Sequence, residues 1–198
     1  MRTFTKTAGI LLGSGLLLSV VAAPSLAGAA PISSSSNVDV TVSGGTVAAT
    51  TYGTTLDAVI LNGSEQTTKK KTGSWLLTDA RGTGAAWALT ATATDFTSAI
   101  GDTDTTVRTI PAANLAINLT SIAALGSSDA APTASSVSAL SSTVQSTLVS
   151  ATSSKGSYSV LTPEYALTVP ANAFRSNFAT GVSGAMHPYV STVTFTIG

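Results

Sequence analysis

Residues 74–93 constrain the fold of this chain more than any other stretch. They contain both tryptophans, Trp75 and Trp87, and each tryptophan begins a run in which every second residue is apolar. An apolar period of two is the pattern of a β-strand that buries one face. Between the runs, Asp79-Ala80-Arg81-Gly82-Thr83-Gly84 supplies an aspartate that favours turns and two glycines that tolerate positive φ. The stretch therefore predicts two strands joined as a β-hairpin.

The first 29 residues are predicted to be a secretory signal peptide. Arg2 and Lys6 give a basic start, an apolar run follows, and small residues then continue up to residue 30. The apolar run is short for a membrane span, and no later run reaches the ~20 residues that a span needs. We therefore expect a secreted, extracellular protein without membrane insertion after signal cleavage. Residues 30–37 are predicted to be a flexible Ser-rich leader, and residues 38–198 a single domain.

Cysteine is absent, so no disulfide can brace the exported chain. Small cysteine-rich secreted scaffolds are thereby excluded, and stability has to come from a buried core, which a domain of this length can form. Without the two basic residues of the signal peptide, seven Lys and Arg remain beside nine Asp and Glu, which gives a net charge of −2. Nucleic acid is therefore not expected as a partner, because nucleic-acid-binding domains present basic surfaces.

Alternating apolar residues continue along most of the remaining chain and predict an all-β fold. Residues 65–72, which include three lysines, and residues 96–106 are expected to be loops. About nine or ten short strands separated by turn signals are typical of an antiparallel β-sandwich. Outside residues 74–93, strands are expected at 38–42 and 46–52, joined by a turn at Gly44-Gly45, and at 56–61, 108–110, 115–119, 158–160, 165–169 and 189–197.

The segment 123–156 is rich in Ser, Thr and Ala and leaves two interpretations open. Its apolar residues from Val137 to Leu148 recur at three- and four-residue steps, as in a short helix. Val144, Leu148 and Val149 equally fit a Thr-rich strand. We favour a loop around residues 130–132, followed by a strand at about residues 143–151.

The turn between the two tryptophans resembles a motif of a known family. Asp79-Ala80-Arg81-Gly82 followed by Trp87-Ala88-Leu89 is similar to the proximal motif of the WxL surface domains of Gram-positive bacteria. The stretches 93–96, 110–115 and 167–171 also resemble that family. Where the family usually carries a second, distal Trp-x-Leu, this chain has Phe195-Thr196-Ile197. The resemblance covers most of residues 38–198.

The resemblance implies a β-rich domain held non-covalently at the cell wall, with peptidoglycan or another wall polymer as the ligand. The printed sequence ends at Gly198 without a sorting motif, an apolar anchor or a basic tail, so we expect retention through a binding face of the domain. For a diverged member the alternatives are simple secretion or docking onto another surface protein. The candidate ligand-binding or motif residues are Trp75, Asp79, Arg81, Trp87, Leu89, Tyr189 and Phe195.

These residues also have structural interpretations. The tryptophans either stack on sugar rings or fill the core; for Trp87 the core is favoured, since a strand tryptophan buries a large apolar surface, and for Trp75 both interpretations stay open. For Asp79 and Arg81, an ion pair that braces the turn is favoured over a ligand contact. Three adjacent lysines at residues 69–71 either contact anionic wall polymers or, as favoured, form a solvated face.

No catalytic motif is recognisable in the sequence. His187 is the single histidine, so no cluster of ligands has metal-site spacing, and no Gly-x-Ser-x-Gly elbow occurs. We predict no catalytic residue, no metal and no cofactor, and hence a non-enzymatic surface protein. The alternative function is a structural or adhesive surface subunit that associates with other proteins, for instance by adding strands at sheet edges.

Overall fold

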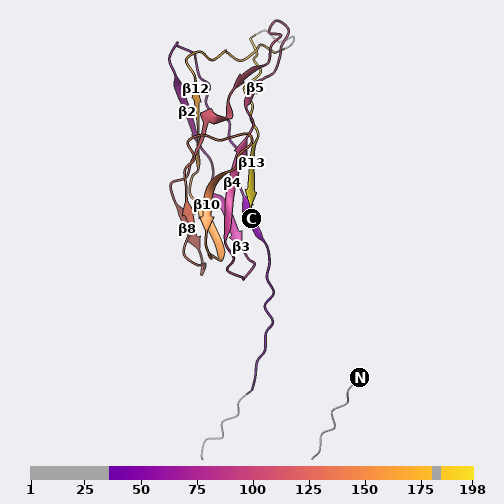
Figure 1. Ribbon diagram of the computed structural model, residues 1–198, viewed down its shortest axis with the longest axis vertical. Coiled ribbons are helices and arrows are strands. Elements are labelled where there is room, and N and C mark those ends of the chain that lie inside the picture. Colours follow the sequence, from indigo (N-terminus) through magenta and orange to yellow (C-terminus); the bar gives the residue numbers. More distant parts are fainter. Residues whose placement is uncertain (1–35, 180–183) are drawn as a thin grey trace, which may run out of the picture. The chain divides into compact units, whose positions relative to one another are not determined.

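The computed structural model describes residues 36–179 and 184–198, and these form an all-β fold, as predicted. All thirteen strands of the described residues lie within the compact unit Thr41–Gly198, and they pair antiparallel (Figure 1). The predicted signal peptide at residues 1–29 and most of the predicted leader lie outside the described residues. The elements are β1 (Val47–Thr50), β2 (Gln66–Lys71), β3 (Trp75–Asp79), β4 (Trp87–Ala93), β5 (Phe96–Ser98), β6 (Arg108–Ile110), the 3-10 turn η1 (Ala112–Asn114), β7 (Leu115–Asn118), β8 (Ile122–Leu125), β9 (Thr133–Ala134), β10 (Ser146–Ala151), β11 (Gly156–Val160), β12 (Glu164–Val169) and β13 (Val193–Ile197).

The first layer of the sandwich is built from three long strands that are each interrupted once. They are β2 continued by β3, β7 continued by β8, and β11 continued by β12. The register is the same on both sides of the interruption, since Val160 pairs with Trp75 and Glu164 pairs with Lys71. The strand order is β3-β11-β8 on one side and β2-β12-β7 on the other, with β1 added beside β3. The described residues hold more strands than the nine or ten expected because β2, β5, β8 and β9 were not expected as strands.

The interruption lies at the same level in all three long strands. Thr162 has a positive φ of 40°, and Pro163 has no N–H to donate to a ladder. The strands stay connected there, because the Thr72 N–H donates to the Pro163 carbonyl (2.8 Å) and the Leu161 N–H donates to the Ser121 carbonyl (3.0 Å). The ladder is therefore broken without a change of register.

The second layer is the sheet β13-β4-β10-β9. The pair β5-β6 continues this layer beyond the end of β4, since Thr97 in β5 and Val190 exchange two backbone hydrogen bonds of 2.9 Å. After β9 the chain crosses to the edge of the first layer, where Val137 and Ile117 also exchange two hydrogen bonds of 2.9 Å. This crossing closes one side of the sandwich.

The predicted hairpin at residues 74–93 is wrong, although both of its strands exist. β3 pairs with β1 and β11 in the first layer, whereas β4 pairs with β10 and β13 in the second. The turn between them is therefore an arch that connects the layers. Both strands carry a buried row, with Trp75 on β3 and Trp87 on β4. In an arch the two rows face each other and form the core, which a flat hairpin does not achieve.

Two of the other predicted strands are absent from the described residues. Val38, Val40 and Val42 are 94%, 85% and 87% exposed and belong to no strand. The expected turn before β1 does not form, because the Gly45 N–H donates to the Ala80 carbonyl (2.7 Å) and prolongs the β1-β3 ladder. Residues 56–61 also form no strand; contacts such as the hydrogen bond from the Gln66 side chain to the Ile60 carbonyl (2.9 Å) hold them against β2.

Two predicted loops contain strands. The lysine-rich residues 66–71 form β2, whose backbone pairs with β12 while the lysine side chains are exposed. An edge strand often carries lysine, which discourages pairing with other chains, so charge here does not indicate a loop. β5 occupies the start of the other predicted loop. In residues 123–156 the described chain forms most of β8, then β9 and β10, and no helix; β10 agrees with the favoured strand.

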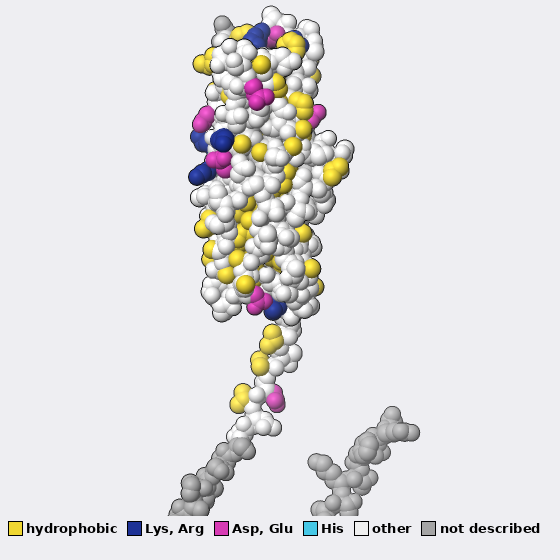
Figure 2. Space-filling view, turned by 60° about the vertical axis from the view of Figure 1, so that its left-hand side comes forward, with side chains coloured by type: hydrophobic (Ala, Val, Ile, Leu, Met, Phe, Trp, Pro, Cys, Tyr) yellow, Lys and Arg dark blue, Asp and Glu magenta, His cyan; other side chains and the backbone are white. Residues whose placement is uncertain are grey.

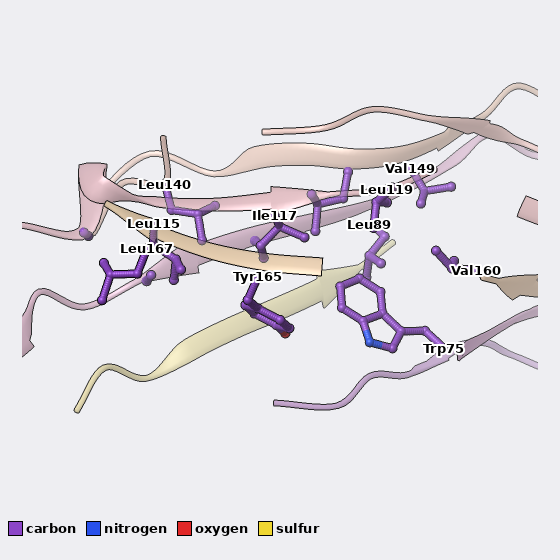
Figure 3. Packing of buried hydrophobic residues seen from close by; sticks show 14 of the residues in the cluster. Trp75, Leu89, Leu115, Ile117, Leu119, Leu140, Val149, Val160, Tyr165 and Leu167 are labelled. Atoms are coloured by element: carbon purple, nitrogen blue, oxygen red, sulfur yellow. The ribbon is translucent and has the colours of Figure 1, made fainter. Parts of the chain in front are cut away.

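One hydrophobic core fills the space between the layers (Figure 3). Its largest fully buried side chain is Trp75, at the start of β3. The Trp75 ring meets two other rings at steep angles: its centroid lies 6.3 Å from that of Tyr165 on β12 and 5.1 Å from that of Phe195 on β13. Trp75 therefore links the two layers at the level where the first layer is interrupted.

Candidate functional site

An ion pair between Asp79 and Arg81 holds the arch from β3 to β4. Asp79 is 1% exposed, and its carboxylate accepts hydrogen bonds from the Arg81 backbone N–H (3.0 Å), Nε (2.9 Å) and a terminal nitrogen (2.9 Å). The same terminal nitrogen donates to the Ala85 carbonyl (2.8 Å) near the other end of the arch. The Arg81 hydrogen bonds lower the pKa of Asp79, although burial acts in the opposite direction. The carboxylate is therefore ionised at neutral pH, and the arch has a fixed shape.

A second arch connects β10 to β11 and lies beside the first. Trp87, where β4 begins, donates its indole N–H to the Ser154 carbonyl (2.9 Å) in this second arch. The Trp87 ring centroid lies 6.2 Å from that of Tyr158 on β11, and the Tyr158 hydroxyl donates to the Lys155 carbonyl (2.6 Å). Both aromatic side chains thus bury their rings in the core and bond with their polar atoms to the second arch, so the core fixes its position.

The second arch presents an exposed ion pair to solvent. Lys155 Nζ lies 2.7 Å from the Asp129 carboxylate, and the Lys155 backbone N–H donates to the same oxygen (3.0 Å). The lysine side-chain hydrogen bond lowers the pKa of Asp129, and the same bond raises the pKa of Lys155. A shallow, open depression lies around this pair, lined by residues 125–129 and 155–157. We call the surface formed by residues 79–85, 125–129 and 153–157 the polar end.

The polar end offers hydroxyl groups, backbone groups and charges of both signs on a shallow surface. Charged side chains are few on the face of the protein in Figure 2, and they gather in small groups. An apolar small molecule needs an enclosed apolar pocket, which this depression does not provide.

Only part of the predicted site lies at the polar end. Asp79 and Arg81 belong to it, whereas Trp75, Trp87 and Leu89 lie in the core with exposed fractions of 1%, 3% and 0%. Neither indole therefore presents a face on which a sugar ring could stack. The role of Trp87 at the polar end is indirect, through its hydrogen bond to Ser154.

The remaining two predicted residues lie elsewhere. Phe195 is half-buried against Trp75, and β13 places it opposite Ala91. Tyr189 donates its hydroxyl to the Phe174 carbonyl (3.0 Å), beside the bridge from Val190 to β5. The structure thus brings the proximal and distal motifs together as neighbouring strands, since β4 pairs with β13, but it does not bring Tyr189 to the polar end.

Sequence reasoning missed Asp129, Ser154 and Lys155. Their positions depend on how the turn after β8 meets the second arch, where the Asp129 N–H donates to the Lys155 carbonyl (3.0 Å). Residues so far apart in a Ser-, Thr- and Ala-rich segment give no local signal of this contact. The one available sign was that Asp129 and Lys155 are the two charged residues of segment 123–156.

Residues 36–179 and 184–198 contain no group of three or more side chains arranged to hold a metal ion. In the same part of the chain no helix has the length and apolar character needed to cross a membrane. His187 lies outside the polar end, and its backbone N–H donates to the Asn177 carbonyl (2.7 Å).

Comparison with known proteins identifies the family. A family model described as "WxL domain surface cell wall-binding" matches residues 45–165, which include the proximal motif, both arches and the polar end. Tyr189 and Phe195 lie beyond the matched residues. No curated protein and no solved structure matches the chain. Because the family model covers more than half of the chain, this protein belongs to the WxL domain family of surface proteins that bind the cell wall.

Proposed function

We propose that this is an exported, non-enzymatic protein that binds peptidoglycan non-covalently through its polar end. In this proposal residues 1–29 are a secretory signal peptide, residues 30–37 a leader, and residues 38–198 the wall-binding domain. The observation that carries the proposal is that the family match at residues 45–165 contains every residue of the polar end. The family is described by wall binding, so a surface inside the matched region is the first place to seek the ligand.

The chemistry of the polar end supports a peptidoglycan ligand. Peptidoglycan carries sugar hydroxyls, acetamido groups and peptide carboxylates, all of which form hydrogen bonds in water. Lys155 is about half exposed, so its ammonium group can exchange the Asp129 carboxylate for a peptide carboxylate. Backbone and serine groups of residues 125–129 lie around it and can bond hydroxyl and acetamido groups. Asp79 and Arg81 have a positioning role, because their bonds to each other and to Ala85 fix the first arch.

The test is a sedimentation assay with purified peptidoglycan and two charge-reversal variants. Lys155→Glu places a negative charge at the polar end and should release the protein into the supernatant. Lys70→Glu is the matched control, since Lys70 also lies 2.7 Å from an aspartate, and the two lysine side chains are 45% and 44% exposed. Circular dichroism and urea unfolding should show both variants folded.

The outcomes test two points separately: whether the protein binds peptidoglycan, and whether it does so through the polar end. Binding of the wild type and Lys70→Glu but not of Lys155→Glu supports the proposal. A wild-type protein that stays in the supernatant contradicts peptidoglycan binding, and equal binding by both variants contradicts the polar end. Repeating the assay with walls that retain their anionic polymers identifies another wall polymer as the ligand if only those walls bind the protein.

A further inference from the structure

β13 is an edge strand of the second layer, and β1 of the first layer approaches it without pairing with it. It pairs with β4 on one side, and no strand of the described residues pairs with its other side (Figure 1). Natural proteins usually protect such edges with lysine, proline, a bulge or very short length. β2 has its lysines and β9 is two residues long, but β13 is an uninterrupted Val-Thr-Phe-Thr-Ile.

Along β13, the residues whose backbone N–H and C=O groups point away from β4 also carry half-buried apolar side chains. Ala88 and Gly198 exchange two hydrogen bonds, so in the antiparallel ladder every second residue back from Gly198 faces β4. The residues between them, Val193, Phe195 and Ile197, turn their N–H and C=O groups toward the open edge. Their side chains are half-buried and pack against the core. A strand added here would satisfy those backbone groups and cover the apolar row.

The chain contains a segment with a matching pattern. Val38, Val40 and Val42 alternate with polar residues, like the three apolar residues of β13, and they are 94%, 85% and 87% exposed. β-branched residues in alternation favour a strand, yet this segment has no partner within the described residues. Its pattern therefore predicts a strand that the described residues of one molecule do not pair.

Local structure keeps this segment from forming a hairpin with β1 of its own molecule. A hairpin onto β1 needs a turn at residues 43–46, but Gly45 and Thr46 are extended and bonded to Ala80 in the β1-β3 ladder. A Cβ atom on Gly44 would clash with the Arg81 carbonyl, so the backbone lies tightly against the first arch there. Folding back would break these contacts, whereas pairing with another molecule leaves them intact.

We propose that residues 38–42 of one molecule add as a strand to the β13 edge of a second copy. In this arrangement Val38, Val40 and Val42 cover the half-buried row, while Asp39 and Thr41 face solvent beside the threonines of β13. Each molecule has one donor segment and one acceptor edge. Two molecules can exchange segments reciprocally, or successive molecules can extend a chain. The proposal does not depend on peptidoglycan binding, because β13 lies outside the polar end.

Sedimentation of the purified exported protein tests self-association with a matched pair of variants. The wild type is expected to associate increasingly with concentration. Val40→Asp puts a carboxylate against the apolar row and should weaken association by about tenfold or more. Thr41→Asp adds the same charge one residue further on, where the side chain faces solvent, and should retain association. A wild type that is monomeric at every accessible concentration, or equal weakening by both variants, overturns the proposal.

Crosslinking identifies the edge, and the absence of native cysteine makes it specific. Thr41→Cys protein is mixed with Thr194→Cys or Thr196→Cys protein and oxidised; cross-strand neighbours lie about 4.5–5.5 Å apart, within reach of a disulfide. A mixed disulfide with either β13 variant is expected. Ser127→Cys, in the exposed turn after β8, is the control. If Thr41→Cys crosslinks equally to Ser127→Cys and to the β13 variants, residues 38–42 do not add specifically to the β13 edge. The absence of any crosslink to the β13 variants also contradicts the proposal.

Discussion

The ring of Phe195 meets that of Trp75 at 69° with 5.1 Å between centroids, although the two residues belong to different layers. Trp75 lies where the long strands of the first layer are interrupted, and Phe195 lies in the open edge strand of the second. An edge-to-face pair adds about 0.5–1.5 kcal/mol to the burial of its rings. This contact therefore holds the two layers together at a point where the first layer has lost ladder hydrogen bonds.

Replacing Phe195 should show how much this contact contributes. Phe195→Ala is expected to lower the free energy of unfolding by roughly 3 kcal/mol, the lower end of the range for buried phenylalanine, because Phe195 is only half-buried. Thr194→Ala, the exposed neighbour on β13, should change it little. Urea unfolding followed by circular dichroism gives both values. Similar losses of unfolding free energy for the two variants would show that the contact between Phe195 and Trp75 does not stabilise the fold.

The two tryptophans should respond differently to replacement by phenylalanine. Trp87→Phe leaves the Ser154 carbonyl without its indole donor, which costs about 1–3 kcal/mol beyond the lost volume. The buried indole N–H of Trp75 has no hydrogen-bond partner among the described residues, so Trp75→Phe removes an unsatisfied group. We therefore expect Trp87→Phe to be the more destabilising change by about 1–3 kcal/mol. Calorimetry of both variants tests this, and equal unfolding temperatures would refute it.

Loss of the arch ion pair should be costly because one partner is buried. Arg81→Ala leaves the carboxylate of Asp79, 1% exposed, without its charge partner; an unpaired buried carboxylate costs about 3–5 kcal/mol. The double variant Asp79→Ala with Arg81→Ala should recover part of that loss. Lys155→Ala, which breaks an exposed pair, is the control and should have a much smaller effect. A double variant no more stable than Arg81→Ala would argue against the buried charge as the cause.

The pH dependence of stability should report on the same carboxylate. The pKa of Asp79 is lowered in the folded protein, so its contribution is present above the ordinary value of 3.8 and is lost as the pH falls through the folded-state pKa. Asp79→Asn should therefore be less stable than the wild type at neutral pH. The difference should shrink below about pH 5, which urea unfolding across pH measures. A difference independent of pH would exclude Asp79 ionisation as its source.

Sequence alone predicted which residues form much of the sheet but not which strands pair. The alternation of apolar and polar residues around Trp87 and Leu167 is a local signal, because a strand with one buried face needs an apolar residue at every second position. Pairing depends on contacts distant in sequence, so an Asp-x-Arg-Gly turn looked like a hairpin and is an arch. The lysines of β2 concealed a strand because an edge position exposes its side chains while its backbone pairs with β12.

The residues of the polar end could also be predicted only where their contacts are local in sequence. Asp79 and Arg81 interact two residues apart, so turn chemistry identified them. Asp129 and Lys155 meet only because the turn after β8 packs beside the second arch. No spacing rule connects them, and only the folded arrangement reveals the polar end.

The arches also determine when folding can finish. Among consecutive strands of the described residues, only β5 with β6 and β9 with β10 are paired; the other ladders join strands that are distant in the chain. A polypeptide that emerges N-terminus first cannot complete its first layer before β12, or its second before β13. Long-range pairing is slow, typically in the millisecond-to-second range. Neither layer can therefore form all of its ladders until most of the chain has emerged.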